Sequence, residues 1–188
     1  MFIVALAGVL LGGGETPMKN RIDTNTSILA PFFYAGAIRD AIRAAKFARD
    51  PRGLKIMAAQ IRQKIAHLQF DTIVPIPTTA ERLNARGFNL PDIIADEIKR
   101  DDTAIVHALA RNNGQTQYGT DTHQRLANAL TLFRVRGNEA RRLTGKKTLI
   151  IDDVTATGAT LLAAYNLLAP YTHILHCLAA ARSPRAKH

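Results

Sequence analysis

The pattern of apolar and polar positions divides the chain into a helical first part and a second part where strands and helices alternate. Apolar residues at helical spacing predict one helix over residues 37–48 and another after Pro51. A β-branched run over residues 71–77, stopped by two prolines, predicts a strand. The elements predicted beyond it are a helix from Pro91, strands over 104–110, 131–135 and 147–151, a helix over 159–168 and a strand over 172–180. Near-continuous apolar strands joined by helices indicate an α/β protein whose parallel sheet carries helices on both faces.

Two adjacent carboxylates, Asp152 and Asp153, follow the apolar strand predicted over residues 147–151. They stand at the carboxyl end of that strand, which is where ligands bind in sheets of this kind. Burying a carboxylate is costly unless it is paired or hydrogen-bonded, so this pair requires donors. The hydroxyls of a ribose diol would serve, because an ionised carboxylate only accepts hydrogen bonds. A divalent cation is the other partner that the pair allows.

A short turn of small and hydroxyl-bearing residues joins the acidic pair to the next helix. Its members are Thr155, Ala156, Thr157, Gly158, Ala159 and Thr160. Backbone N–H groups at a helix start favour an anion, and a glycine permits a tight turn. We interpret the turn as a phosphate cradle beside a diol-binding pair, which together describe a ribose 5-phosphate site. The plainer interpretation is a strand followed by an ordinary helix cap.

Positive charge dominates the composition. The formal net charge is +10, and such a surface attracts polyanions, either nucleic acid or a phosphosugar with magnesium. Arg39, Arg43 and Lys46 recur at helical spacing, so they form either a contact surface for DNA or a solvated helix face. Against nucleic acid, the seven Phe and four Tyr fall mostly in apolar patterns and predict no stacking platform.

The single cysteine, Cys177, excludes a disulfide or a cysteine-based zinc site within the chain, and its apolar neighbours predict a small buried side chain. The apolar run over residues 2–11 is too short for a transmembrane helix and lacks the preceding positive charge of a signal peptide. We therefore expect a cytoplasmic protein with no membrane span.

The domain organisation predicted is a peripheral extension over 1–28, one domain over 29–182 and a frayed basic tail over 183–188. Residues 1–17 are compatible with an added strand, a contact segment or an upstream extension.

The strand, the acidic pair and the Thr-Gly-x-Thr turn together resemble the signature with which type I phosphoribosyltransferases bind 5-phosphoribosyl-1-pyrophosphate (PRPP). Other motifs narrow the resemblance to the competence protein F family, over about residues 29–182. These motifs are Val74–Pro77, Arg82, Arg86–Asn89, Phe33–Arg39, Lys46 and Phe47, Gln117, Arg125, Asn128, Leu132 and Phe133.

This resemblance implies a type I phosphoribosyltransferase fold with a small N-terminal helical hood over about residues 29–68. Asp152 and Asp153 would hold the ribose hydroxyls, and the turn from Thr155 to Thr160 would hold the 5-phosphate. The loop that would face the pyrophosphate contains Pro77, Thr78, Thr79, Arg82 and Arg86, and its guanidinium groups suit phosphate. A flexible loop with Arg111 and Gln117 would close over the site. For both loops an ordinary surface role is the alternative.

The resemblance further implies that magnesium binds together with PRPP and is not coordinated directly by protein side chains. It also implies transfer of the phosphoribosyl group to an unknown acceptor with release of pyrophosphate. The alternative is a non-catalytic accessory protein of DNA uptake that binds single-stranded DNA or competence-machinery proteins, and an oligomer is compatible with either. Ala156 stands where some members have an aspartate suggested as an acid or base, so we assign no catalytic residue. Thr79, Ala80 and Glu81 replace the usual histidine and arginines.

Overall fold

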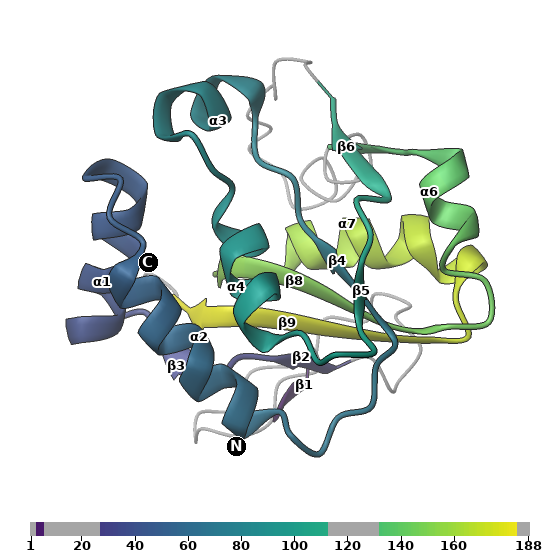
Figure 1. The fold of residues 1–188 in the computed structure, drawn as a ribbon, viewed down its shortest axis with the longest axis horizontal. Coiled ribbons are helices and arrows are strands. Elements are labelled where there is room, and N and C mark those ends of the chain that lie inside the picture. The colour runs from purple at the N-terminus through teal and green to yellow at the C-terminus, as the bar shows by residue number, and fades with distance from the viewer. Residues whose placement is uncertain (1–2, 6–26, 113–131, 184–188) are drawn as a thin grey trace.

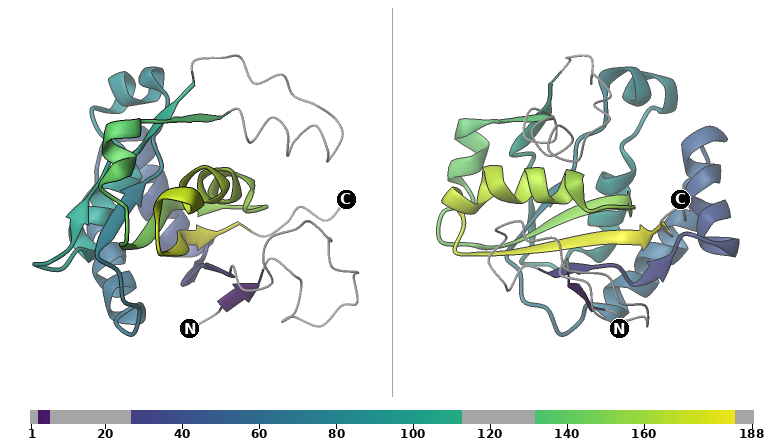
Figure 2. Two further views of the ribbon diagram at one scale, coloured as in Figure 1. Left: turned by 90° about the vertical axis from the view of Figure 1, so that its right-hand side faces the viewer. Right: turned by 180° about the vertical axis from the view of Figure 1, so that it is seen from behind.

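A computed structural model describes residues 3–5, 27–112 and 132–183 of the 188-residue chain. A central sheet runs through the molecule with helices on both of its faces (Figures 1 and 2). The strand order is β1-β2-β9-β8-β4-β5, and β3 also pairs with β9. The strands are β1 Ile3–Ala5, β2 Ser27–Leu29, β3 Phe32–Phe33, β4 Thr72–Pro75, β5 Ala104–Ile105, β8 Lys147–Thr155 and β9 Ile174–Arg182. The pairings are parallel except for the antiparallel pairing of β1 with β2, which confirms the predicted fold class.

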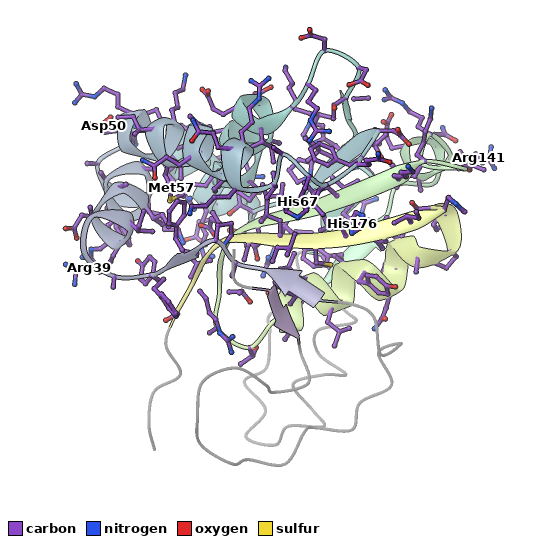
Figure 3. The ribbon with its side chains drawn as sticks, turned by 90° about the horizontal axis from the view of Figure 1, so that it is seen from below. Arg39, Asp50, Met57, His67, Arg141 and His176 are labelled. Carbon is purple, nitrogen blue, oxygen red and sulfur yellow. The ribbon has the colours of Figure 1, made fainter. Side chains whose placement is uncertain are left out.

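Two apolar cores cover the two faces of the sheet. Along β8, Leu149 and Ile151 face one core and Ile150 faces the other, as the alternation of side chains along a strand requires. Helices α1 (Gly36–Phe47), α2 (Arg52–Lys64) and α4 (Leu90–Ile98) pack on the first face, and α7 (Ala159–Leu168) packs on the second. Figure 3 shows the layers from below, with Met57 inside the helical layer and Arg39 at its outer edge.

The prediction of a single strand over residues 104–110 is wrong. This stretch contains two strands. Strand β5 lies at the edge of the main sheet, and β6 (Leu109–Arg111) pairs antiparallel with β7 (Phe133–Val135) in a separate two-stranded sheet. The run is apolar except for His107, but the chain changes sheets within it. The short helix α6 (Gly137–Arg141), which the sequence analysis did not predict, follows this two-stranded sheet.

Strand β8 continues four residues beyond the predicted end at Ile151. The parallel neighbour β9 stays in register as far as Thr155 opposite Arg182, so the polar residues keep backbone partners. Asp152 and Asp153 therefore lie within the strand, near its carboxyl end, and not after it.

Strand β2 begins two residues before the predicted domain boundary at residue 29. Ile28, on β2, is 4% exposed and pairs with Cys177 on β9, which is buried as predicted. Residues 3–5 add a strand to this edge, one of the three possibilities considered for the first 17 residues. Gln117, Arg125, Asn128 and the tail over 184–188 lie outside the described residues. Within the described ranges, no helix has the length and apolarity needed to cross a membrane.

The hood predicted over residues 29–68 consists mainly of α1 and α2, which approach each other closely at a glycine. A Cβ added at Gly53 would lie 2.9 Å from the Ala41 Cβ and 3.3 Å from the Ala41 Cα. The two backbones are therefore held at a distance that only glycine permits at this point.

We expect Gly53→Ala to lower the free energy of unfolding by about 1–3 kcal/mol, because the added methyl group overpacks the contact between α1 and α2. Chemical denaturation monitored by circular dichroism measures this change. Gly137→Ala in α6 is the matched control, because no atom lies within 4 Å of its added Cβ. Equal stability of the two variants would contradict the packing argument.

Candidate functional site

The carboxyl end of β4 lies beside Ile151 of β8, immediately before the acidic pair, and this brings two sequence motifs together. The strands are parallel, with Pro75 opposite Ile151. Just beyond them, the Ile76 N–H donates to the Ile151 carbonyl at 2.9 Å. The loop that leaves β4 therefore starts beside the acidic pair on β8, at the sheet edge where ligands of parallel sheets bind.

A cavity of about 250 Å³ opens at this edge. Its charged lining comes from four separate elements or loops and consists of Lys46, Arg82, Arg86, Arg111, Asp152 and Asp153. Pro77, Thr78, Asn89 and Thr160 are among the uncharged residues of the lining. Four cations thus face two carboxylates. This balance suits a ligand that carries several negative charges and also has hydroxyl groups that can donate to the carboxylates.

The two carboxylates differ in their surroundings. Asp152 is 9% exposed, and burial together with the neighbouring charge of Asp153 raises its pKa to about 8. Asp153 Oδ2 forms an ion pair with the Lys46 Nζ at 2.6 Å. Its Oδ1 accepts the Val154 N–H at 2.7 Å, while the Asp153 N–H donates to Asp152 Oδ1 at 2.8 Å. Asp152 therefore favours its protonated form near neutral pH, and the Lys46 ammonium is paired with the other carboxyl group, that of Asp153.

The ion pair corrects the interpretation of Arg39, Arg43 and Lys46 as one basic stripe. Lys46 belongs to the cavity, whereas Arg39 pairs with Asp40 at 3.0 Å and Arg43 lies 5.4 Å from the ring centre of Phe47. Helical spacing alone predicted a shared face. It did not reveal that the last turn of α1 ends within reach of the buried carboxylates on β8.

The predicted phosphate cradle links β8 to α7. Gly158 has the left-handed backbone conformation, with φ of 84°, immediately before the helix. Its N–H donates to Thr155 Oγ1 at 3.0 Å, and the Ala159 N–H donates to Thr157 Oγ1 at 3.3 Å. Of the six predicted residues, Thr160 lines the cavity. Thr155 ends β8, residues 156–158 form the turn, and Ala159 begins α7. The Gly158 and Ala159 N–H groups are thus taken by threonine hydroxyls, and the later N–H groups of the first turn, which lack partners within the helix, make this end of α7 suited to an anion.

The predicted pyrophosphate loop contains helix α3 (Ala80–Arg86). Thr79 caps this helix by accepting the Arg82 N–H at 3.3 Å, and it lies outside the cavity lining. Helical spacing places Arg82 and Arg86 on one face, and both reach the cavity together with Pro77 and Thr78. Gly87 ends the helix in the left-handed conformation, with φ of 88°.

Sequence reasoning missed the role of Asn89. Its position before a proline-containing helix start is typical of a cap. The structure instead buries the side chain, and its Nδ2 donates to the Ile76 carbonyl at 2.9 Å. Asn89 thereby ties the end of the loop to its beginning and fixes the path of the segment that carries Arg82 and Arg86.

Arg111, predicted for a closing loop, lines the cavity from β6. Burial lowers its pKa, the Arg82 charge lowers it further, and the Asp152 carboxyl raises it. Arg111, Arg82 and Asp152 all line the cavity, and their charges lie close enough to act on one another. Its predicted companion Gln117 lies outside the described residues.

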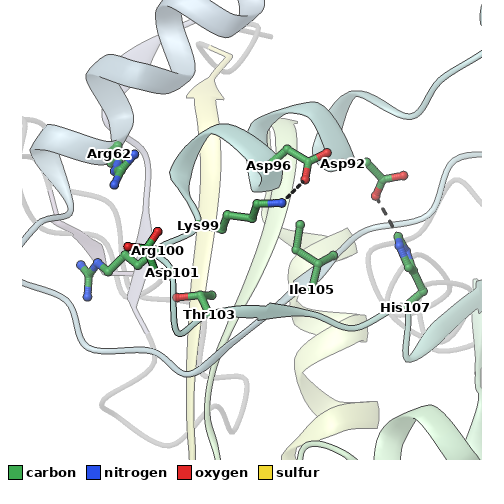
Figure 4. Close-up of a pocket in the computed structure, with 9 residues that line it drawn as sticks. All are labelled: Arg62, Asp92, Asp96, Lys99, Arg100, Asp101, Thr103, Ile105 and His107. Carbon is green, nitrogen blue, oxygen red and sulfur yellow. Dashed lines mark hydrogen bonds and ion pairs between the residues drawn. The ribbon is translucent and has the colours of Figure 1, made fainter.

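A larger cavity of about 800 Å³ lies along α4 and the edge strand β5 (Figure 4). In its lining, Lys99 Nζ lies 2.9 Å from Asp96 one helical turn earlier, and His107 Nδ1 lies 3.9 Å from Asp92 Oδ1. It has no counterpart to the turn before α7, so we place the functional site in the smaller cavity. In the described part of the chain, no group of three or more His, Cys, Asp or Glu side chains is arranged to hold a metal ion.

Comparison with known proteins agrees with this geometry. The phosphoribosyl transferase domain matches residues 48–188, which is most of the chain. The chain belongs to the phosphoribosyl transferase domain family. The match begins after α1, so the helix that carries Lys46 lies outside it.

Curated relatives of this phosphoribosyltransferase-family chain fall into two groups. Competence protein ComFC of Bacillus subtilis is 27% identical over 133 residues, 69% of this chain and 52% of that protein. Adenine phosphoribosyltransferase of Pseudomonas putida is 29% identical over 126 residues, 64% of this chain and 59% of that enzyme. These matches confirm the resemblance to a competence protein F-like type I phosphoribosyltransferase. The chain spans 52% to 59% of the length of these relatives.

Two solved structures are also similar. Adenine phosphoribosyltransferase from Leishmania donovani has a TM-score of 0.48 and 12% identity, covering 87% of this chain and 86% of that one. The allosteric regulatory enzyme of purine biosynthesis has a TM-score of 0.44 and 16% identity, covering 66% of this chain and 24% of that one.

The buried Asp152 carboxyl makes stability depend on pH. Its folded-state pKa of about 8 lies above the ordinary value of 3.8, so folding takes up a proton between these pH values. The free energy of unfolding therefore falls as pH rises through this window, and it stays higher below it.

We expect Asp152→Asn to raise the melting temperature relative to wild type, by at least about 3 °C more at pH 8 than at pH 5. One pKa unit corresponds to about 1.4 kcal/mol, and 1 kcal/mol corresponds to about 2–4 °C for a chain of this size. Differential scanning calorimetry at the two pH values measures the difference. Asp102→Asn, at an exposed loop position, is the control. A gain that is the same at both pH values would show that Asp152 is already ionised at pH 5.

Proposed function

We propose that the protein binds PRPP together with Mg²⁺ in the 250 Å³ cavity and transfers the phosphoribosyl group to an acceptor, releasing pyrophosphate. One observation carries this proposal: the acidic pair, the start of α7 and three arginines meet at a single sheet edge. Membership of the phosphoribosyl transferase domain family and similarity to a relative named adenine phosphoribosyltransferase support it.

Each part of PRPP has a chemically suited partner in the site. The ribose 2- and 3-hydroxyls would donate to Asp152 and Asp153. The 5-phosphate would bind the N–H groups and hydroxyls between Thr155 and Thr160. The pyrophosphate would lie against the guanidinium groups of Arg82, Arg86 and Arg111, which bind phosphate oxygens in pairs.

The reaction is a displacement at C1 of the ribose. The bond from C1 to the pyrophosphate oxygen breaks and that oxygen keeps the electron pair, while the acceptor nucleophile forms a bond to C1. Charge resembling that of an oxocarbenium ion develops on the sugar, as in glycoside chemistry. The protein would contribute position and charge stabilisation. Ala156 has no side chain able to move a proton, so the acceptor's proton would pass to solvent or to the leaving group.

Magnesium fits this site as an ion carried by the ligand. Asp153 is paired with Lys46, and Asp152 favours its protonated form, so neither offers a free anionic ligand. Mg²⁺ prefers phosphate oxygens and retained waters, and it would neutralise the charge of the departing pyrophosphate.

A second candidate function rests on the outer face of α1. The Phe47 side chain is 75% exposed beside Arg43, and Arg39 lies farther along the same helix (Figure 3). Exposed aromatic rings combined with arginines bind the bases and phosphates of single strands. Phe47 is a single exposed ring, so the prediction that the chain lacks a stacking platform stays a prediction. Together with the relative named competence protein ComFC, this face of α1 supports an accessory role in DNA uptake through DNA or a protein partner.

Calorimetric titration of PRPP with Mg²⁺ tests the first proposal. We expect wild type to bind and Asp152→Asn/Asp153→Asn to lose at least about 30-fold in affinity, because the variant weakens two diol hydrogen bonds worth about 1–1.5 kcal/mol each. Asp101→Asn/Asp102→Asn, a double change at exposed positions outside the cavity, controls for the change in net charge. Absence of binding to wild type at millimolar PRPP would reject the phosphoribosyl-transfer proposal.

Fluorescence anisotropy with a labelled single-stranded oligonucleotide tests the second. Arg39→Glu/Arg43→Glu should weaken binding by about 10-fold or more and flatten its salt dependence, because two phosphate contacts are lost. Phe47→Ala should weaken binding without changing the salt dependence. Lys46 is left unchanged here because it belongs to the cavity. If these variants bind DNA as wild type does, the α1 surface is not the contact.

A further inference from the structure

We infer that Lys46 exchanges partners when the site fills: it holds Asp153 in the empty protein and moves to the pyrophosphate of bound PRPP. The inference rests on the proposed function and adds to it a ligand-binding residue from the hood. Lys46 lies two residues before the part of the chain that matches the phosphoribosyl transferase domain.

The geometry makes Lys46 and the ribose competitors for one carboxylate oxygen. Asp153 Oδ1 already accepts the Val154 N–H at 2.7 Å, and Oδ2 accepts the Lys46 ammonium at 2.6 Å. A ribose hydroxyl that donates to Asp153 therefore approaches the oxygen that Lys46 occupies. The side chains of Lys46 and Asp153 are 27% and 16% exposed, so the pair lies in the wall of the cavity, within reach of an entering ligand.

Once displaced, the Lys46 ammonium remains among groups that would bind the pyrophosphate. Arg82, Arg86 and Arg111 line the same 250 Å³ cavity. An ammonium on a flexible four-carbon stem can turn from one anion to another by rotating its side chain alone. Leaving a partly buried cation unpaired is costly, so a negative charge of the ligand becomes its partner, and we assign the pyrophosphate because the three arginines suited to it line the cavity with Lys46.

Another lysine shows what a purely structural ion pair looks like in this fold. Lys55 on α2 lies 3.8 Å from Glu97 on α4, and its side chain is 55% exposed. Neither residue lines the cavity. Exposed pairs of this kind contribute little to stability, so Lys55 provides a matched control for removing a lysine from the helical layer.

The test compares two ligands that differ in the pyrophosphate. PRPP with Mg²⁺ and ribose 5-phosphate with Mg²⁺ are titrated into wild type, Lys46→Met, Lys46→Arg and Lys55→Met. Lys46→Met should bind PRPP about 10-fold more weakly, because a charged hydrogen bond is lost. It should bind ribose 5-phosphate equally well or more tightly, because the competitor for Asp153 is gone. Lys46→Arg should retain PRPP affinity within about threefold, and Lys55→Met should match wild type for both ligands.

The opposite responses separate partner exchange from an anchoring role. If Lys46→Met weakens both ligands equally, or changes neither, the inference is overturned, and Lys46 only fixes α1 to β8. If wild type binds neither ligand, both the proposed function and this inference are rejected. Melting temperatures of all variants establish that each is folded, and Lys46→Arg supplies the comparison if Lys46→Met is not.

Discussion

Two carboxylates placed next to each other near the end of a buried strand are the constraint on which the rest of the site depends. Both cannot be ionised there without a large electrostatic cost. The structure avoids this cost in two ways. Burial and the Asp153 charge raise the pKa of Asp152, so that it keeps its proton, and the Lys46 ammonium pairs with Asp153. A ligand that donates hydrogen bonds to this pair and carries negative charge elsewhere would relieve the same constraint.

The sheet supplies the rigid frame for this arrangement. Strand β8 lies between β4 and β9, all three parallel, and its two faces are covered by separate cores. Strand β4 supports the backbone of β8 as far as Ile151, and β9 supports it as far as Thr155. Asn89 performs a similar task outside the sheet, because its bond to the Ile76 carbonyl holds the arginine-bearing loop against the strand end.

Much of this was predictable from the chain itself. The α/β class, the helices over α1, α2 and α7, and the helical spacing of Arg82 and Arg86 follow from local periodicity, which the structure confirms. The motif that resembles the type I phosphoribosyltransferase signature located the acidic pair and the turn before α7. These features can be predicted because the residues that define each helix or motif lie close together in the sequence.

What was missed depends on contacts between distant segments. The extension of β8 to Thr155 is set by the register of β9, and the split between β5 and β6 is set by a change of sheet. Lys46 had the spacing of a surface stripe, and only the placement of α1 against β8, more than 100 residues later in the chain, reveals its partner. No single-sequence period records such a contact.

A crystal structure of the protein grown with PRPP and Mg²⁺ tests the central claim most directly. The account predicts ribose hydroxyls within hydrogen-bond distance of Asp152 and Asp153, and the 5-phosphate at the start of α7. Ligand density elsewhere on the surface, with the ion pair between Lys46 and Asp153 still closed, would contradict it.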